Sequence, residues 1–348
     1  MTEPLQLRVV EVVEETGDAK SFVFEAPEPL PYKPGQFLTI AVPSDQTGVA
    51  ARCYSLSSAP HESDLLKITV KRTVDGYASN WMCDNVKAGQ TVTALPPSGI
   101  FTPASLDADF LMYAAGSGIT PVISIIKSAL AEGSGHVVLL YANRDESSVI
   151  FARELKELAD KYADRFVYVH WLESLQGLPT PAAFRAFAAN FPTYDAFVCG
   201  PAPFMSGVVD TLKELGFPRE RRHQEKFISL GGNPFGDVDV TIGDPGSESE
   251  EPLRTAPARV SGDLDGEPFD FDDWPPGVPL LDFLHSKGVQ APFSCKLGEC
   301  SACACRVIEG DVAMLNNDVL DKDDLADGIR LVCQSLPVTD ELKITYSG

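Results

Sequence analysis

The stretch CKLGECSAC, which runs from Cys295 to Cys303, places three thiols within nine residues near the end of the chain. Cys295, Cys300 and Cys303 have the spacing C-x4-C-x2-C, and a fourth thiol, Cys333, lies farther along. This spacing is typical of plant-type [2Fe–2S] clusters, in which four thiolates hold two irons. Such a loop aims its backbone amides at the sulfurs and therefore needs small residues, which are present as Gly298, Ser301, Ala302 and Ala304.

A structural zinc site is the alternative for the same thiols. Zinc sites favour paired C-x2-C segments, whereas this region has one such pair and two separate thiols. The spacing therefore favours the iron–sulfur cluster, with Cys295, Cys300, Cys303 and Cys333 as ligands. Cys305 follows on a predicted strand, and we expect it to point away from the cluster as a small core residue.

The composition limits what the chain can do. Its 348 residues are enough for two or three domains, and 44% of them are hydrophobic. The formal net charge of −22 argues against a nucleic-acid partner, because binding phosphates requires basic patches. The N-terminus has no secretory pattern, and no apolar run reaches the roughly 20 residues that span a membrane. We expect a soluble, cytoplasmic protein with reduced thiols.

The chain divides into four predicted regions. Residues 1–104 contain short alternating runs with no helical pattern, which predict an all-β unit, an antiparallel β-barrel. Residues 105–228 alternate apolar strands with helices, which predicts an α/β domain with a parallel sheet. Residues 229–257 are rich in Gly, Pro, Ser and Glu and predict a flexible linker. Residues 258–348 predict a small α+β domain around the cysteines.

The barrel contains a candidate cofactor strand, RCYSLSSAP. On a strand, Arg52 and Tyr54 share one face and Ser55 turns to the other. A flavin needs an aromatic surface for its ring, and a cation with hydroxyl groups for its phosphates. These three residues alone would fit a polar strand on the barrel surface equally well.

Two glycine turns follow strands of the α/β domain. GSGITP contains Gly116 and Gly118, and Pro121 suits the first position of a helix. A helix N-terminus with free amides favours a pyrophosphate, although an ordinary strand-to-helix turn looks the same. The second turn, Cys199-Gly200-Pro201, also leads into a predicted helix.

A third strand end lies between these turns, where HVVLLYANR closes with Tyr141, Asn143 and Arg144. The adenosine end of a dinucleotide lies past the carboxyl edge of such a sheet. Arg144 could hold the 2′-phosphate of NADPH, whereas the neighbouring Asp145 and Glu146 would repel it. The acids favour NADH, with NADPH as the alternative.

Several segments resemble known families. RCYSLSSAP, ITVKR (Ile68–Arg72) and GYASNWM (Gly76–Met82) resemble the flavin segments of the ferredoxin–NADP reductase superfamily. PFSCKLGECSACACRVIEGDV with LVCQS resembles the ferredoxin module of modular flavin reductases, which implies a β-grasp fold. The domain order is shared by FMN-containing phthalate dioxygenase reductases and by FAD-containing reductases. The closest resemblance is to reductases of 3-ketosteroid 9α-hydroxylases, with phenylacetyl-CoA epoxidase reductases nearby.

The resemblance implies a role for each matched residue. In the barrel it implies FAD rather than FMN, held at Arg52, Tyr54 and Ser55, at Thr69, Val70 and Lys71 along the ring and ribityl chain, and at Ala78, Ser79 and Asn80 around the pyrophosphate. In the α/β domain it implies a dinucleotide site that includes Gly116, Gly118, Thr120, Gly200, Pro201, Phe204 and Met205.

Three residues are predicted at the reacting centre: Ser55, Cys199 and Glu225. The resemblance puts Cys199 near flavin N5, and we expect a positioning thiol because no histidine adjoins it in sequence. Phe227 would cover the flavin ring, and Glu225 would tune or relay protons. A solvated charge is the alternative for Glu225.

The resemblance implies the reductase component of a two-component Rieske-type monooxygenase, passing electrons from NADH through FAD and the cluster to a terminal oxygenase. Alternatives are the reductase of an epoxidase, of a phthalate-type oxygenase with FMN or of a desaturase, a stand-alone reductase of a small acceptor, and a redox-responsive binding module. Residues 258–348 hold 17 Asp and Glu against 7 Lys and Arg, which predicts salt-sensitive docking on a basic partner. We expect a monomer.

Overall fold

The computed structural model describes residues 4–45, 48–231, 233–235, 256–264 and 266–346. Its contacts divide the chain into two units. The first comprises residues 1–42, 52–97 and 101–227, and the second comprises residues 228–348 with the short segments 43–51 and 98–100. The flexible linker predicted at 229–257 lies mostly outside the described residues.

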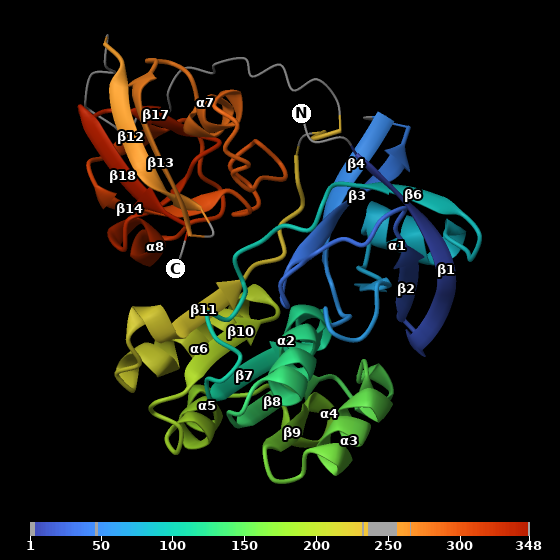
Figure 1. Ribbon diagram of the computed structural model, residues 1–348. Helices are drawn as coiled ribbons and strands as arrows, with labels where there is room; N and C mark the ends of the chain where they lie inside the picture. Colours follow the sequence, from blue (N-terminus) through green and yellow to red (C-terminus); the bar gives the residue numbers. More distant parts are fainter. Residues whose placement is uncertain (1–3, 46–47, 232, 236–255, 265, 347–348) are drawn as a thin grey trace. The chain divides into compact units, whose positions relative to one another are not determined.

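The first unit begins with a six-stranded antiparallel sheet in the order β4-β3-β6-β1-β2-β5 (Figure 1). A bridge between Leu56 and Ile68 joins the chain just after β4 to β5, which closes the sheet into the predicted barrel. Its core includes Leu7, Phe22 and Ile40, all fully buried. The strands are β1 (Leu5–Thr16), β2 (Ala19–Glu25), β3 (Phe37–Ser44), β4 (Gly48–Ser55), β5 (Leu66–Lys71) and β6 (Thr91–Ala94).

One helix, α1 (Tyr77–Asn85), lies within the stretch that was predicted to be all-β, so that prediction was wrong here. Ala78, Met82 and Cys83 are its buried residues, and they pack on the barrel core. Their spacing matches one face of a helix. The helix is short enough that the surrounding strand patterns masked this signal.

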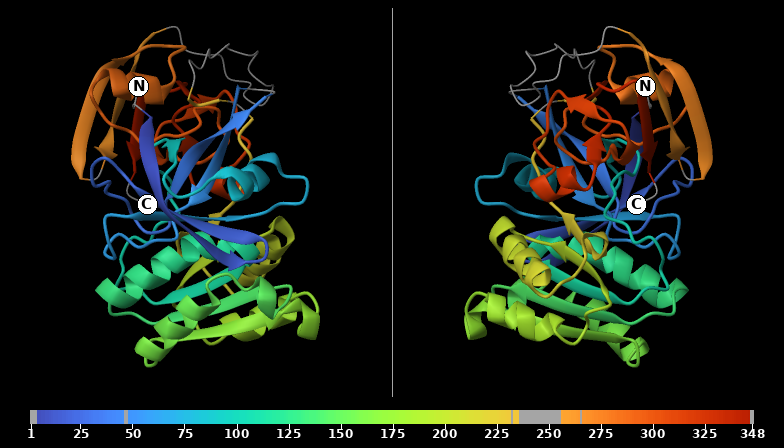
Figure 2. Two further views of the ribbon diagram at one scale, coloured as in Figure 1. Left: turned by 90° about the vertical axis from the view of Figure 1, so that its right-hand side faces the viewer. Right: turned by 90° about the vertical axis from the view of Figure 1, so that its left-hand side faces the viewer.

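The second part of this unit is a parallel sheet in the order β11-β10-β7-β8-β9, as predicted. Helices cover both faces (Figure 2): α2 and α3 pack on one side, and α5 and α6 on the other. The strands are β7 (Phe110–Ala115), β8 (Val137–Asn143), β9 (Phe166–Leu172), β10 (Asp195–Cys199) and β11 (Arg222–Glu225). The helices are α2 (Ile119–Glu132), α3 (Ala152–Lys161), α4 (Glu173–Gln176), α5 (Pro181–Ala188) and α6 (Ala202–Glu214).

The strand order has one reversal that matters for function. From β7 the chain builds outward through β8 to β9, and it then returns to place β10 on the other side of β7. The carboxyl ends of β7 and β10 therefore flank a topological switch point. Ligands of open α/β sheets bind at such points.

The second unit contains a five-stranded sheet in the order β13-β12-β18-β14-β16 and a two-stranded sheet, β15-β17. β12 runs parallel to β18 and antiparallel to β13. Trp274 and Leu284 are fully buried in its core. The elements are β12 (Ala258–Leu264), β13 (Glu267–Trp274), α7 (Leu280–Ser286), β14 (Ala304–Glu309), β15 (Val312–Met314), α8 (Lys322–Ala326), β16 (Ile329–Leu331), β17 (Ser335–Pro337) and β18 (Glu341–Thr345).

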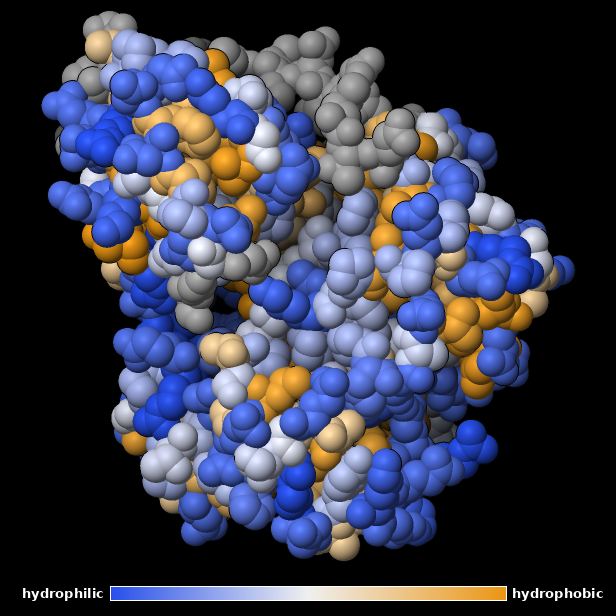
Figure 3. Space-filling view, in the orientation of Figure 1, coloured by the Kyte–Doolittle hydropathy of each residue, from blue (hydrophilic) through white to orange (hydrophobic). Residues whose placement is uncertain are grey.

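The surface is mainly polar where it can be seen. Hydrophilic residues cover most of the face shown in Figure 3, and the apolar residues there form small groups. Among the described residues, no helix is long and apolar enough to cross a membrane.

Candidate functional site

The two predicted glycine turns lie against each other at the switch point. β7 and β10 pair in parallel, with Cys199 opposite Ala114. A Cβ atom built on Gly118 would lie 2.1 Å from the carbonyl oxygen of Cys199, so no side chain fits there. A Cβ atom on Gly200 would likewise lie 2.9 Å from the Cβ of Ala115. The glycines thus permit a close backbone approach between segments far apart in sequence.

The first turn leads directly into a helix. A short 3₁₀ segment, Gly116–Gly118, precedes α2, and no side chain caps either start. Pro121 was predicted at the first position of the helix, but it is the third residue of α2. It still lies in the first turn, where its missing N–H costs no hydrogen bond. Thr120 is buried, and its hydroxyl donates to the Ser117 carbonyl at 3.0 Å. The uncapped amides at this helix start suit a pyrophosphate.

The predicted adenosine end surrounds the carboxyl end of β8. The Tyr141 hydroxyl donates to the Gly116 carbonyl at 3.0 Å, which ties β8 to the first turn. Asn143 is buried, and neither polar atom of its side-chain amide has a hydrogen-bond partner among the described residues. Arg144 is exposed, and its Nη2 lies 2.7 Å from a carboxylate oxygen of Asp18. A bound nucleotide would supply the partners that Asn143 lacks.

Cys199 and Glu225 end adjacent strands and lie opposite each other in register. Both are buried, with Cys199 0% and Glu225 7% exposed, so the solvated alternative for Glu225 was wrong. Burial raises the pKa of Glu225 to about 8. Burial, followed by the Glu225 charge, raises the pKa of Cys199 well above its usual value. At neutral pH the pair therefore holds a neutral thiol beside a largely protonated carboxyl, which fits a positioning thiol and a proton store.

The remaining residues of the predicted reacting centre lie on other elements. Ser55 is buried at the end of β4, on a different sheet from Cys199 and Glu225. Phe227 follows β11 and is 48% exposed, so its ring is available to cover a ligand. The closeness of Ser55 to the pair remains a prediction.

The second turn continues into α6. Pro201 occupies the position before this helix and provides no side-chain cap, and Met205 is buried against the sheet. The Phe204 ring packs edge-on against Phe184 at 5.4 Å, and its Cδ1 atom would lie 3.0 Å from a Cβ on Gly200. Phe204 therefore forms one wall of the turn, and it holds the backbone of Gly200 in place.

Arg52 and Tyr54 lie together on β4, as the sequence predicts. Burial raises the pKa of Tyr54, and the charge of Arg52 acts in the opposite direction, which shows that the two groups are close. The Tyr54 ring packs partly against the barrel core. An aromatic ring beside a cation is the combination that a flavin ring and its phosphate require.

The three residues predicted along the ring and ribityl chain behave differently from one another. The Thr69 hydroxyl forms hydrogen bonds with the hydroxyls of Ser21 at 2.8 Å and Ser57 at 2.9 Å. Val70 is fully buried in the barrel core. These two residues offer mainly their backbone to a ligand. Lys71 instead extends toward the α/β domain, where its Nζ would lie 3.9 Å from a Cβ on Gly116.

The predicted flavin pyrophosphate site is the start of α1. Gly76 precedes this helix and provides no side-chain cap. The Ser79 hydroxyl accepts a hydrogen bond from the Thr73 amide at 3.1 Å, and the Asn80 amide donates to the carbonyls of Thr73 and Gly76. Since these side chains hold the preceding loop, and Ala78 is buried, the helix start offers backbone N–H groups to a phosphate.

In the second unit, the four predicted thiol ligands form two pairs. The Cys295 amide donates to the Cys300 sulfur at 3.4 Å. A separate hydrogen bond between the two thiols lowers the pKa of Cys295. Cys303 contacts Cys333, which raises the pKa of Cys303. The amides of Leu297 and Glu299 donate to the Cys295 sulfur at 3.3 and 3.4 Å, as expected for a loop that wraps a cluster.

Two pairs suit a two-iron cluster, in which four thiolates are divided between two irons. Among the described residues, no three or more His, Cys, Asp and Glu side chains form a group that could hold a metal ion. The Tyr346 hydroxyl is buried without a hydrogen-bond partner in the described part of the chain. Burial, followed by the charges of Cys305, Cys303 and Cys333, raises its pKa, so the tyrosine lies on the cysteine-rich side of this domain. The donor set therefore fits [2Fe–2S].

Cys305 behaves as a core residue. It is 3% exposed and packs in the hydrophobic core of the second unit. Burial raises its pKa to about 12, so it stays a thiol at neutral pH. Cys305 also lies outside the two thiol pairs described above, so it fits the predicted role of a core residue.

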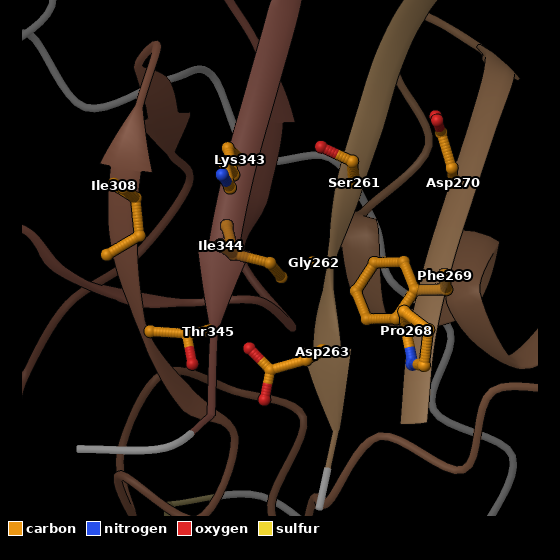
Figure 4. A pocket seen from close by; sticks show the side chains of 10 residues that line it. All are labelled: Ser261, Gly262, Asp263, Pro268, Phe269, Asp270, Ile308, Lys343, Ile344 and Thr345. Atoms are coloured by element: carbon orange, nitrogen blue, oxygen red, sulfur yellow. The ribbon is translucent and has the colours of Figure 1, made fainter. Parts of the chain in front are cut away.

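A separate hollow of about 620 Å³ lies on the sheet of the second unit (Figure 4). Side chains of β12, β13 and β18 line it, together with Ile308 of β14. None of the predicted site residues is among them. This hollow is therefore not the candidate site.

Three family models match the chain in the predicted order. The oxidoreductase FAD-binding domain matches residues 6–102, the oxidoreductase NAD-binding domain residues 112–210, and the 2Fe-2S iron-sulfur cluster binding domain residues 263–338. The ferredoxin reductase component of 3-ketosteroid-9-alpha-monooxygenase from Rhodococcus rhodochrous is 55% identical over 98% of this chain and 96% of that protein. The chain belongs to this family of reductase components.

More distant relatives also align with nearly the whole chain. A subunit of 1,2-phenylacetyl-CoA epoxidase from Escherichia coli is 32% identical, covering 100% of this chain and 99% of that protein. The crystal structure of phthalate dioxygenase reductase superposes with a TM-score of 0.58 at 25% identity, covering 98% of each chain. The family thus gives this reductase FAD in the barrel, NADH in the α/β domain and a [2Fe–2S] cluster in the C-terminal domain.

A buried lysine that was not predicted from the sequence joins the flavin and nicotinamide parts of the reductase. Lys127 of α2 has a side chain only 3% exposed, and its Nζ lies 2.8 Å from Glu62 and 3.1 Å from Glu154. It also donates to the Ser57 carbonyl at 2.8 Å. A single lysine within the apolar run PVISIIKSAL was the available signal, because a buried cation must find acceptors.

Proposed function

We propose that this chain is the reductase component of a 3-ketosteroid 9α-monooxygenase-like system, delivering electrons from NADH to a Rieske-type terminal oxygenase. The observation that carries the proposal is the close approach of the Gly118 turn to the Cys199 turn, which supports a dinucleotide site at the switch point. Support also comes from relatives of that name at 50–55% identity over nearly the full chain.

The three groups supply complementary redox chemistry when bound: the nicotinamide gives a hydride, the flavin takes two electrons and releases them singly, and the cluster carries one at a time. The residues of the chain position and insulate this transfer. Cys199 and Glu225 form a buried neutral floor at the carboxyl ends of β10 and β11. Phe227, exposed just beyond, is proposed to cover the flavin ring until the nicotinamide replaces it.

We assign Glu225 the role of holding a proton. Its raised pKa keeps the carboxyl largely protonated at neutral pH, and it lies beside Cys199 in strand register. With Glu225 protonated, the pair places no uncompensated negative charge next to an electron-rich reduced flavin. Ser55 on β4 is proposed to complete the reacting centre from the barrel side.

The partner is proposed to be a separate oxygenase with a basic docking surface. The excess of 17 Asp and Glu over 7 Lys and Arg within residues 258–348 supports this. Long-range attraction of this kind raises association rates and weakens as salt is added. The second-order rate of oxygenase reduction should therefore fall with ionic strength, and a rate independent of salt would contradict electrostatic docking.

We propose that the reductase works as a cytoplasmic monomer. None of the eight cysteines, all of which lie in the described residues, forms a disulfide, and the cytoplasm is the compartment that keeps thiols reduced. Sedimentation of the holoprotein at working concentration would test the monomer, and cell fractionation would test the location.

The experiment that tests the function pairs the purified reductase with purified terminal oxygenases. With NADH and a 3-ketosteroid, the steroid oxygenase should turn over, and its rate should exceed that of a phenylacetyl-CoA epoxidase complex supplied with the same reductase. Faster electron delivery to the epoxidase would assign the chain to that second system. Rapid NADH oxidation with ferric iron or a quinone, but with neither oxygenase, would favour a stand-alone reductase.

A further inference from the structure

Asp18, in the turn between β1 and β2, joins two cations of the dinucleotide site. One of its carboxylate oxygens lies 2.7 Å from Nη2 of Arg144 and 3.7 Å from Nζ of Lys71. Its other oxygen accepts from the Thr16 hydroxyl at 2.8 Å, which fixes the orientation of the carboxylate. Asp18 comes from the flavin barrel, whereas Arg144 follows β8 of the α/β domain.

The position of this cluster relates it to one end of the dinucleotide. Arg144 adjoins Asn143, whose buried amide lacks a partner in the described residues, and Lys71 approaches the Gly116 turn. In doubly wound sheets the residue after the second strand meets the adenosine ribose, where an acid favours NADH and an arginine favours NADPH. In this chain Arg144 stands at that position, but it already forms an ion pair with Asp18.

We propose that Asp18 is the residue that makes this reductase select NADH over NADPH. By pairing with Arg144 it occupies the guanidinium that the 2′-phosphate of NADPH would need. Asp145 acts in the same direction: hydrogen bonds, first from Ser147, lower its pKa and keep it ionised.

Lys71 does not account for the selection. It would act on the pyrophosphate that both dinucleotides share, because it approaches the turn at Gly116. Loss of the Asp18–Lys71 contact should therefore change kcat/KM equally for NADPH and NADH, so its effect cancels in the ratio of the two values. The ratio of the two kcat/KM values isolates the effect on Arg144. This inference rests on the dinucleotide placement proposed above.

The test compares Asp18→Asn, Arg144→Gln and the double variant in the holoprotein, with flavin reduction followed anaerobically in a stopped-flow instrument. Asp18→Asn should raise the NADPH-to-NADH ratio roughly tenfold, a modest factor because Arg144 is exposed. The double variant should return the ratio to the wild-type value. Arg144→Gln alone should change the ratio less than twofold, because Asp18 already occupies this arginine.

Glu25→Gln is the matched control. Glu25 lies on the same hairpin and pairs with Arg8, and its loss removes one charge from the barrel without touching the Asp18 cluster. The control should leave the ratio unchanged. Equilibrium binding of NADP⁺ and NAD⁺ gives a second readout, with NADP⁺ affinity rising only in Asp18→Asn.

Two results would overturn the inference: a ratio in Asp18→Asn within twofold of wild type, or a gain that persists in the double variant. If the wild-type protein oxidises neither dinucleotide, the proposed function itself fails. If it oxidises NADH and the ratio does not respond to Asp18, only the present inference fails. Flavin content and circular dichroism establish that each variant is folded.

Discussion

Gly118 lies so close to Cys199 that a Cβ atom on the glycine would sit 2.1 Å from the cysteine carbonyl oxygen. This contact joins the turn after β7 to the turn after β10. It sets the width of the switch point, because the obstructing atoms belong to backbone and cannot rotate away. The dinucleotide site therefore depends on a residue without a side chain at this position.

Gly118→Ala should separate the two turns. The carbonyl of Cys199 must move, so we expect a loss of about 1–3 kcal/mol in the free energy of unfolding, as in overpacked cores. Flavin reduction by NADH should slow by more than tenfold, since a shift of about 1 Å at a reacting centre is costly. Gly17→Ala is the control, because a Cβ there meets nothing within 4 Å. Similar kinetics in both variants would show that the contact does not shape the site.

Glu225→Gln should change how stability depends on pH. The carboxyl keeps its proton up to about pH 8 in the folded protein, against an ordinary pKa of 4.5, so the free energy of unfolding falls as the pH rises between these values. His223 acts in the opposite direction, but only between about pH 4 and 6.5, because burial lowers its pKa. Above pH 6.5 the His223 contribution is absent, and the difference in thermal unfolding between wild type and Glu225→Gln removes the contributions that both proteins share.

In that range the wild-type midpoint should fall relative to that of Glu225→Gln, which cannot ionise. Glu214→Gln, at an exposed carboxylate paired with Arg185, should give a difference independent of pH. A constant difference between wild type and Glu225→Gln would mean that Glu225 is ionised throughout.

Lys127→Met should loosen the junction of the flavin and nicotinamide parts. It removes a buried cation and leaves Glu62 without its ion-pair partner, whereas Glu154 keeps Lys67 at 3.4 Å, so we expect a loss of about 2–4 kcal/mol in chemical denaturation. Burial alone would raise the pKa of Glu62, but the Lys127 charge lowers it, so the contribution should also disappear as the pH falls below about 4.5. Lys156→Met, at an exposed pair with Asp160, should leave the free energy of unfolding almost unchanged. Equal losses would refute the role of Lys127.

Serine substitutions at the cysteines should separate ligands from the core thiol. Cys295→Ser, Cys300→Ser, Cys303→Ser and Cys333→Ser should each lower the iron content and the iron–sulfur absorption while flavin reduction by NADH continues. Cys305→Ser should keep both irons, because Cys305 is a core residue outside the two thiol pairs. Loss of iron in Cys305→Ser, with full iron in one of the other four, would require a different ligand set.

The sequence was sufficient where the chemistry is local. The spacing of Cys295, Cys300 and Cys303 and the alternating strands of the barrel carry their meaning in neighbouring residues, and the predicted fold was confirmed. The helix α1 was missed because a nine-residue helix between strands has little pattern of its own. The partners of Lys127 and Arg144 were not predicted, because Glu62 and Asp18 are distant in sequence and only the folded chain brings them near. The buried state of Glu225 depends on its position beside β10, which no local pattern reveals.

The measurement that tests the account most directly is an anaerobic NADH titration of the purified protein, followed by visible absorption, with identification of the released flavin and metal analysis. The account predicts flavin bands overlaid by broad iron–sulfur absorption, both bleached by NADH, with FAD released and two irons for each flavin. A flavin spectrum without the iron–sulfur component, with zinc bound, would contradict the assignment of Cys295, Cys300, Cys303 and Cys333.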